Sequence, residues 1–101
     1  MTDPLVLRGP EGAITVAPAA LEHLVVRAAQ SVDGARVRRP KRSVEVAHGA
    51  GRASVSFELA VEHGAPVPEL ARAVQERVAE AVAATSGLEV DRVDVSVEEI
   101  A

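Results

Sequence analysis

Residues 67–97, VPELARAVQERVAEAVAATSGLEVDRVDVSV, contain the pattern that decides the fold. Apolar side chains recur every three or four residues from Val67 to Val82, which predicts an amphipathic helix with a single apolar stripe. Gly87 predicts the end of this helix, because glycine readily takes the left-handed conformation that closes helices. The valines at positions 93, 95 and 97 then alternate with polar residues, which predicts a strand with one buried face.

The same signals recur earlier in the chain. They predict a short strand over residues 13–16 and a helix that begins at Ala17 or Pro18 and ends near Gly34. Two further strands are expected over residues 43–47 and 54–62. If Ala50 and Gly51 form a two-residue turn between them, Val46 faces Val55 and Val44 faces Phe57, with all four side chains on one side.

The predicted order is strand, helix, strand, strand, helix, strand. The simplest packing for this order is an α+β fold, a two-layer sandwich of a mainly antiparallel sheet with both helices on one face. The polar positions of the strands, among them Glu58, Glu62, Asp94 and Glu98, then give the other face an acidic and serine-rich surface.

Composition limits the class of protein. The chain has 101 residues, 48% of them hydrophobic but with Phe57 as the single aromatic, which favours one domain with a modest core. We assign residues 1–11 to a flexible N-terminal tail, although residues 5–7 would also fit an edge strand, and residues 12–101 to the domain. The chain has no cysteine, no membrane-length apolar run and no secretory signal pattern, so we expect a cytoplasmic protein.

No catalytic pattern is present in the sequence. His23, His48 and His63 fall on separate predicted elements, where they do not converge as metal ligands must. The serines lack the setting of a nucleophile elbow, and the carboxylates have no Trp or Tyr platform of a glycosidase beside them. We therefore predict a non-enzymatic protein with no catalytic residue, metal site or cofactor.

The anomaly in charge is a basic segment in a chain of net charge −4. Five of the eleven basic residues lie in it: Arg36, Arg38, Arg39, Lys41 and Arg42. Pro40 interrupts the segment, which favours a loop or an irregular edge. Such a loop can simply be solvated, or it can contact an acidic protein, nucleic acid or lipid headgroups. It has no interleaved aromatics for base stacking, and the net charge argues against general affinity for nucleic acid. We take these five residues as the candidate partner-binding site.

Four motifs in order suggest a family. They are GAITV at 12–16, FELAVEHG at 57–64, VPELARAVQERV at 67–78, and TSGLEV at 85–90 with VDVSV at 93–97. Together they resemble the alkaline shock protein family, also called the envelope stress response family, of Gram-positive bacteria. The chain departs from that pattern in the arginine-rich run between Gly34 and Val44, where the family often has a glycine-rich variable loop.

This resemblance implies a non-enzymatic envelope stress response protein that acts as a small interaction or scaffold domain. It implies that the domain self-associates, or docks to related family members or to a membrane-anchored partner that holds it at the inner face of the cell membrane. The family brings no catalytic or cofactor residues. The alternative hypothesis from the residues is a nucleic-acid-binding α+β module that uses the basic loop from Arg36 to Arg42.

Overall fold

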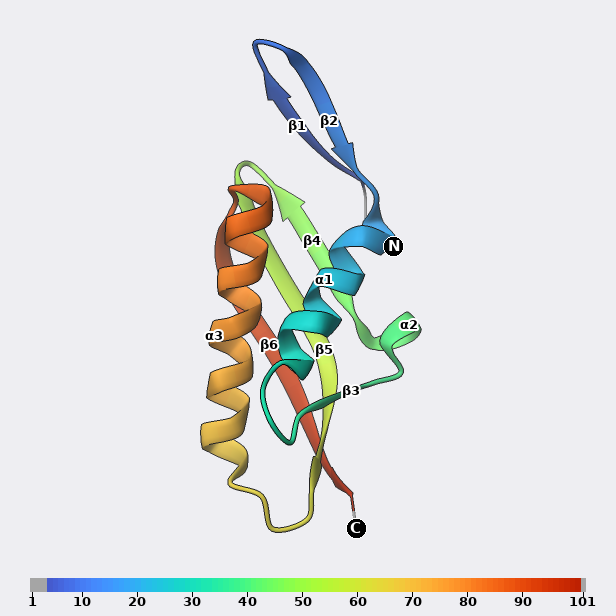
Figure 1. Cartoon of the computed structure of the whole chain (residues 1–101), viewed down its shortest axis with the longest axis vertical. Helices are drawn as coiled ribbons and strands as arrows, with labels where there is room; N and C mark the ends of the chain where they lie inside the picture. The colour runs from blue at the N-terminus through green and yellow to red at the C-terminus, as the bar shows by residue number, and fades with distance from the viewer. Residues whose placement is uncertain (1–3, 101) are drawn as a thin grey trace.

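The structure of the protein is a computed structural model. It describes residues 4–100, except for the side chain of Ile100. It has two layers, with α1 and α3 on one face of a sheet (Figure 1). This confirms the predicted α+β sandwich. The predicted order of six elements was wrong, because the described residues form nine, and the strand predicted at residues 13–16 pairs in a separate hairpin and not in the main sheet. The elements in chain order are β1 (Leu5–Gly9), β2 (Gly12–Val16), α1 (Pro18–Gln30), β3 (Arg36–Arg38), α2 (Pro40–Ser43), β4 (Glu45–Gly49), β5 (Arg52–Glu62), α3 (Val67–Ser86) and β6 (Glu89–Ile100).

Strand β5 is the centre of the main sheet. Along one side it pairs antiparallel with β4 and then with the short β3, and along the other side it pairs in parallel with β6. The parallel pairing arises because α3 carries the chain back to the end where β5 began, as crossover helices do. Leu59 and Val61 on this strand are almost completely buried, with exposed fractions of 0% and 1%.

The core lies between the sheet and the two helices. Helix α3 buries Val74, Val78 and Val82, which are spaced four residues apart. The apolar stripe predicted for this helix therefore forms. The helix ends at Gly87, whose φ of 74° is left-handed as expected. Helix α1 contributes Leu21, Val25 and Ala29 to the same core.

The turn between β4 and β5 has the predicted register. Gly49 pairs with Arg52, and Val46 pairs with Val55. The two turn residues, Ala50 and Gly51, have φ angles of 51° and 77°. Positive φ at both positions is the geometry of a type I′ turn, which matches the twist of the flanking strands. The register is thus fixed by a turn in which alanine occupies a position that favours asparagine or glycine.

Replacing Ala50 by asparagine is expected to raise the free energy of unfolding by about 1 kcal/mol, because asparagine tolerates the left-handed conformation better than alanine. Urea denaturation followed by circular dichroism measures the change. The matched variant Gly51→Ala places a Cβ at the other positive φ and is expected to destabilise the domain. Equal stability of all three chains would contradict this account of the turn.

The N-terminal segment differs from the expectation. The flexible tail was predicted over residues 1–11, whereas Leu5–Gly9 forms β1 and pairs antiparallel with β2 in a separate hairpin that projects at one end of the molecule (Figure 1). The strand forms because Leu5, only 5% exposed, packs into the core and lies opposite Val16. Residues 1–3 of the predicted tail and Ala101 of the predicted domain lie outside the described residues.

Candidate functional site

The basic segment is partly ordered as a strand. Arg36–Arg38 forms β3 along β5, where an irregular loop was expected. The reason is Val37, which is 7% exposed and places its side chain in the core. The side-chain oxygen Oε1 of Gln30 in α1 accepts a hydrogen bond of 3.1 Å from the Val37 N–H. Because side chains alternate along a strand, Arg36 and Arg38 both lie on the outer face of the sheet, opposite the helices.

Arg38 is already engaged within the chain. Its guanidinium forms an ion pair with the carboxylate of Glu98 on β6. Arg36 and Glu98 both lie opposite Ala60, and Arg38 lies opposite Glu58, so this ion pair crosses the central strand diagonally. Ala60, which this diagonal passes, is only 7% exposed although it is on the outer face. Arg38 therefore holds the sheet together as well as adding charge to its surface.

Of the remaining three cations, Lys41 and Arg42 lie on α2, and Arg39 immediately precedes it. Arg39 has a left-handed φ of 46°, and its carbonyl accepts hydrogen bonds of 2.8 Å from the N–H groups of Arg42 and Ser43. The Ser43 hydroxyl donates to the Arg38 carbonyl. This compact turn leaves Arg39, Lys41 and Arg42 exposed, and within residues 4–100 none of them has an ion-pair partner. We call these three residues the turn cluster.

The structure thus divides the five predicted site residues into two groups. Arg36 and Arg38 belong to the sheet face, and the turn cluster lies beside it at the edge formed by β3 and β4. The sequence alone does not show this division. It arises because the residues just before Pro40 pair with β5, and the chain leaves β5 at Pro40. The only signal for it was the apolar Val37 between two arginines.

The outer face of the sheet has no covering element among residues 4–100 (Figure 1). Its centre, on β5, consists of Ser54, Ser56, Glu58 and Ala60, so one carboxylate stands among small side chains, and its margins are charged. On β6, Arg92 and Asp94 form an ion pair with 2.7 Å between Nη2 and Oδ2. The arrangement is a polar face of mostly small residues with charges of both signs in and around it.

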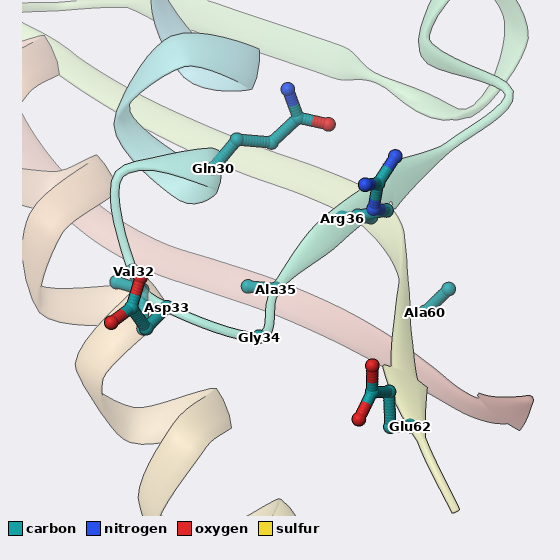
Figure 2. A pocket seen from close by; sticks show the side chains of 8 residues that line it. All are labelled: Gln30, Val32, Asp33, Gly34, Ala35, Arg36, Ala60 and Glu62. Carbon is teal, nitrogen blue, oxygen red and sulfur yellow. The ribbon is translucent and has the colours of Figure 1, made fainter.

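A hollow of about 500 Å³ lies where α1 ends and β3 begins (Figure 2). Its charged lining residues are Asp33, Arg36 and Glu62, and the Gln30 amide points into the same region. No serine, cysteine, histidine or lysine is among the eight lining residues, so this hollow offers no nucleophile or general base of those types.

A second hollow of about 470 Å³ lies between α1 and α2. Its lining residues are Glu22, His23, Val26, Arg27, Pro40 and Lys41 of the turn cluster. The hollow therefore joins the turn cluster to α1, and its lining has charges of both signs beside the apolar Val26.

The histidines do not gather into a metal centre in the described part of the chain. Within it, no group of three or more His, Cys, Asp or Glu side chains could hold a metal ion. Nδ1 of His63 lies 3.0 Å from a carboxylate oxygen of Glu99 at the exposed end of β6. His23 lines the second hollow.

None of the helices between residues 4 and 100 is long and apolar enough to cross a membrane.

Comparison with solved structures supports the fold. A variant of MamM CTD in its copper form superimposes with a TM-score of 0.57 at 21% identity, covering 82% of this chain and 98% of that one. A variant in its nickel form gives the same score and identity and covers 82% and 99%. At such identity the similarity concerns the fold alone.

A search of the curated proteins found no match. A family model, that of the alkaline shock protein 23 family with a cell envelope-related function, matches residues 7–101. The match covers nearly the whole chain, and it confirms the resemblance inferred from the four sequence motifs. This chain belongs to the alkaline shock protein 23 family.

Proposed function

We propose that this chain is a non-enzymatic interaction domain of the envelope stress response. It binds a protein partner, which is a membrane-anchored protein, a family member or a second copy of itself. A membrane-anchored partner would hold the domain at the cytoplasmic face of the cell membrane. The family's cell envelope-related description supports the setting, and the surface of the domain supports the mode of action.

The observation that carries the proposal is the bare outer face of a sheet that contains a parallel pair. Parallel strands normally have both faces covered, because crossover helices pack on each side. Here α1 and α3 cover one face of β5 and β6, and no helix or strand among residues 4–100 covers the opposite face around Ser54, Ser56 and Glu58. A sheet face that this chain leaves without a second layer is a surface on which a partner can supply that layer.

The turn cluster adds a site for an acidic partner at the margin of that face. Its three cations lack ion-pair partners within residues 4–100, whereas Arg38 is bound to Glu98. Exposed charges at the rim of an interface chiefly steer association and select partners of opposite charge. We therefore propose that the turn cluster attracts the partner. Arg36 and Arg38 instead shape the sheet surface that the partner contacts.

Reversing the turn cluster with Arg39→Glu, Lys41→Glu and Arg42→Glu is expected to weaken partner binding about tenfold without unfolding the domain. The partner is recovered with tagged full-length chain from separated membrane and soluble fractions of the native cells. The matched control reverses Arg8, Arg72 and Arg77, three exposed arginines far from α2 in the sequence, and so changes the net charge equally. Equal loss in both variants would show that net charge alone matters and would remove the turn cluster from the proposal.

Nuclease treatment separates the proposal from its alternative. A membrane protein or family member that stays bound after nuclease supports the interaction domain. Recovery of nucleic acid that is lost on treatment, with affinity that falls steeply as salt rises, would favour the nucleic-acid-binding module built on the same cations.

A further inference from the structure

Strand β6 forms a long free edge of the main sheet. It has 12 residues, and within residues 4–100 it pairs only with β5. The opposite edge is shared by β3 and β4 and is interrupted by α2 with Pro40 at its start. Such interruption protects an edge from pairing with other chains, whereas a regular edge, which β6 has from Arg92 onward beyond its bulge at Asp91, is a template for another strand. Strand β6 contains neither proline nor lysine.

The alternation of main-chain groups shows which residues of β6 face this edge. The two-residue turn closes on the Gly49–Arg52 pair, so Arg52 directs its main-chain N–H and C=O toward β4. Val55 is three residues farther and directs its groups toward β6. Val93 lies directly opposite Val55, and in a parallel ladder directly opposite residues point their groups the same way. Val93, Val95 and Val97 therefore present their N–H and C=O groups to the free edge.

A hydrogen bond from α3 agrees with this assignment. The side-chain amide of Gln75 donates to the Val93 carbonyl at 3.0 Å, which places that carbonyl within reach of a group outside the β5–β6 ladder. A carbonyl oxygen has two lone pairs and can accept a second hydrogen bond. The side chains of Val95 and Val97 are half-buried although they lie on the core face. Both main-chain groups and apolar area at this edge remain available.

We propose that this edge binds a second copy of the chain, with the two β6 strands antiparallel and Val95 opposite Val95 of the other copy. This inference goes beyond the proposed function, because it concerns the β6 edge and not the outer face or the turn cluster. Charge selects the register. When the pair is centred on Val95, each Arg92 lies opposite Glu98 of the other copy, and each Asp94 lies opposite Ser96. Within one copy Arg92 already pairs with Asp94, and Glu98 with Arg38, so the contact between copies joins these two ion pairs into one network. Opposite charges at facing positions stabilise antiparallel pairs, and like charges destabilise them.

The neighbouring registers are less favourable. Centring the pair on Asp94 sets the two Asp94 carboxylates opposite each other, and centring it on Ser96 sets Asp94 opposite Glu98. Larger shifts toward the start of β6 run into the bulge at Asp91, where the ladder with β5 skips from Val90 to Arg92. In the Val95 register the two sheets join into one, and Val93 packs against Val97 across the axis.

Helix α3 leaves room for this approach. Gln75 lies on the flank of α3 nearest the free edge, since its amide reaches Val93. Residues four positions apart share a helix flank, so Ala71, Ala79 and Ala83 lie on the same side. All three are small, and each is only half-buried. Two copies joined through β6 would bring these flanks together, where alanine permits close approach of the helices.

Single cysteines test the register, because the full chain has none of its own. Val95→Cys is expected to give a disulfide-linked dimer on mild oxidation, since directly opposite Cα atoms in a hydrogen-bonded pair are about 5.5 Å apart. Val93→Cys and Val97→Cys are the matched controls and are expected to remain largely unlinked, because each then faces a valine. Preferential linking at position 93 or 97 would overturn the register.

A charge swap provides the second measurement. Arg92→Glu, which sets two glutamates opposite each other at positions 92 and 98, is expected to weaken dimerisation about tenfold in sedimentation equilibrium of the full chain. Adding Glu98→Arg is expected to restore it, since the pair is then reversed in sign. Because this change also removes the Arg38–Glu98 ion pair, Glu98→Arg alone is the control, and it is expected to dimerise as weakly as Arg92→Glu. A wild-type chain that stays monomeric at millimolar concentration, with no linking at Val95→Cys, would overturn this inference. If such a chain still recovers a membrane protein, the proposed function survives and only the self-pairing fails.

Discussion

Replacing Val78 by aspartate is expected to unfold the domain. Val78 is 0% exposed and lies in the middle of the buried row on α3, so the new carboxylate would have neither water nor a cation beside it. Burying an uncompensated charge costs several kcal/mol, and the lost valine contacts add to that cost. A domain of this size is stable by only about 5–10 kcal/mol, so little or no net stability remains.

The measurement is the far-ultraviolet circular dichroism spectrum and its thermal transition. The control is Arg77→Asp, which places the same side chain on the neighbouring, exposed residue, where it removes only a long hydrogen bond of 3.3 Å to the Ser31 hydroxyl. We expect this control to fold and to melt near the wild-type temperature. A cooperative, wild-type-like transition in Val78→Asp would show that α3 does not pack as described.

Replacing Leu59 by alanine is expected to lower the free energy of unfolding by about 2–5 kcal/mol. Leu59 lies on the central strand with 0% of its surface exposed, and its truncation removes apolar contacts and leaves a cavity. The loss falls on the strand that pairs with β3, β4 and β6, so neighbouring strands cannot close the space without breaking pairs. We expect the upper part of this range for that reason.

Urea denaturation quantifies the change, and Ser56→Ala on the same strand is the matched control. Ser56 points to the bare outer face, so this variant is expected to stay within about 0.5 kcal/mol of the wild type. A comparable loss of unfolding free energy in both variants would mean that the Ser56 side chain is packed against other groups and is not open to solvent. A small loss for Leu59→Ala would mean that the core collapses around the site.

Much of the fold follows from local patterns. The stripe of Val74, Val78 and Val82 and the stop at Gly87 predict α3, and the alternation around Ala50-Gly51 predicts the β4–β5 register. Both signals are local, because they depend on residues a few positions apart. The strand order is not local. Whether β6 pairs with β5 in parallel depends on how α3 packs across the sheet, and no spacing in residues 89–100 encodes that choice.

The candidate site was less accessible to sequence reasoning. The five cations were predicted as one loop because charge and Pro40 dominate the segment. The structure places Val37 in the core, which turns Arg36 and Arg38 onto the outer face of the sheet and leaves the other three at the start of α2 and within it. Likewise, the hydrophobicity of Leu5 alone does not show that a strand at the N-terminus pairs with β2. In both cases a single buried side chain, recognisable only in three dimensions, decides the local structure.

The crossover through α3 also orders the folding of the chain in time. Strands β4 and β5 meet between residues three positions apart at their turn, whereas the β5–β6 pairs join residues 37 or 38 positions apart, such as Arg52 with Glu89. Closing the longer loop costs more entropy, and non-local pairings therefore form later. During synthesis, the central strand keeps an open edge beside Phe57 until β6 has left the ribosome. Refolding yield should therefore fall as protein concentration rises, because a second chain can reach that edge before β6 does.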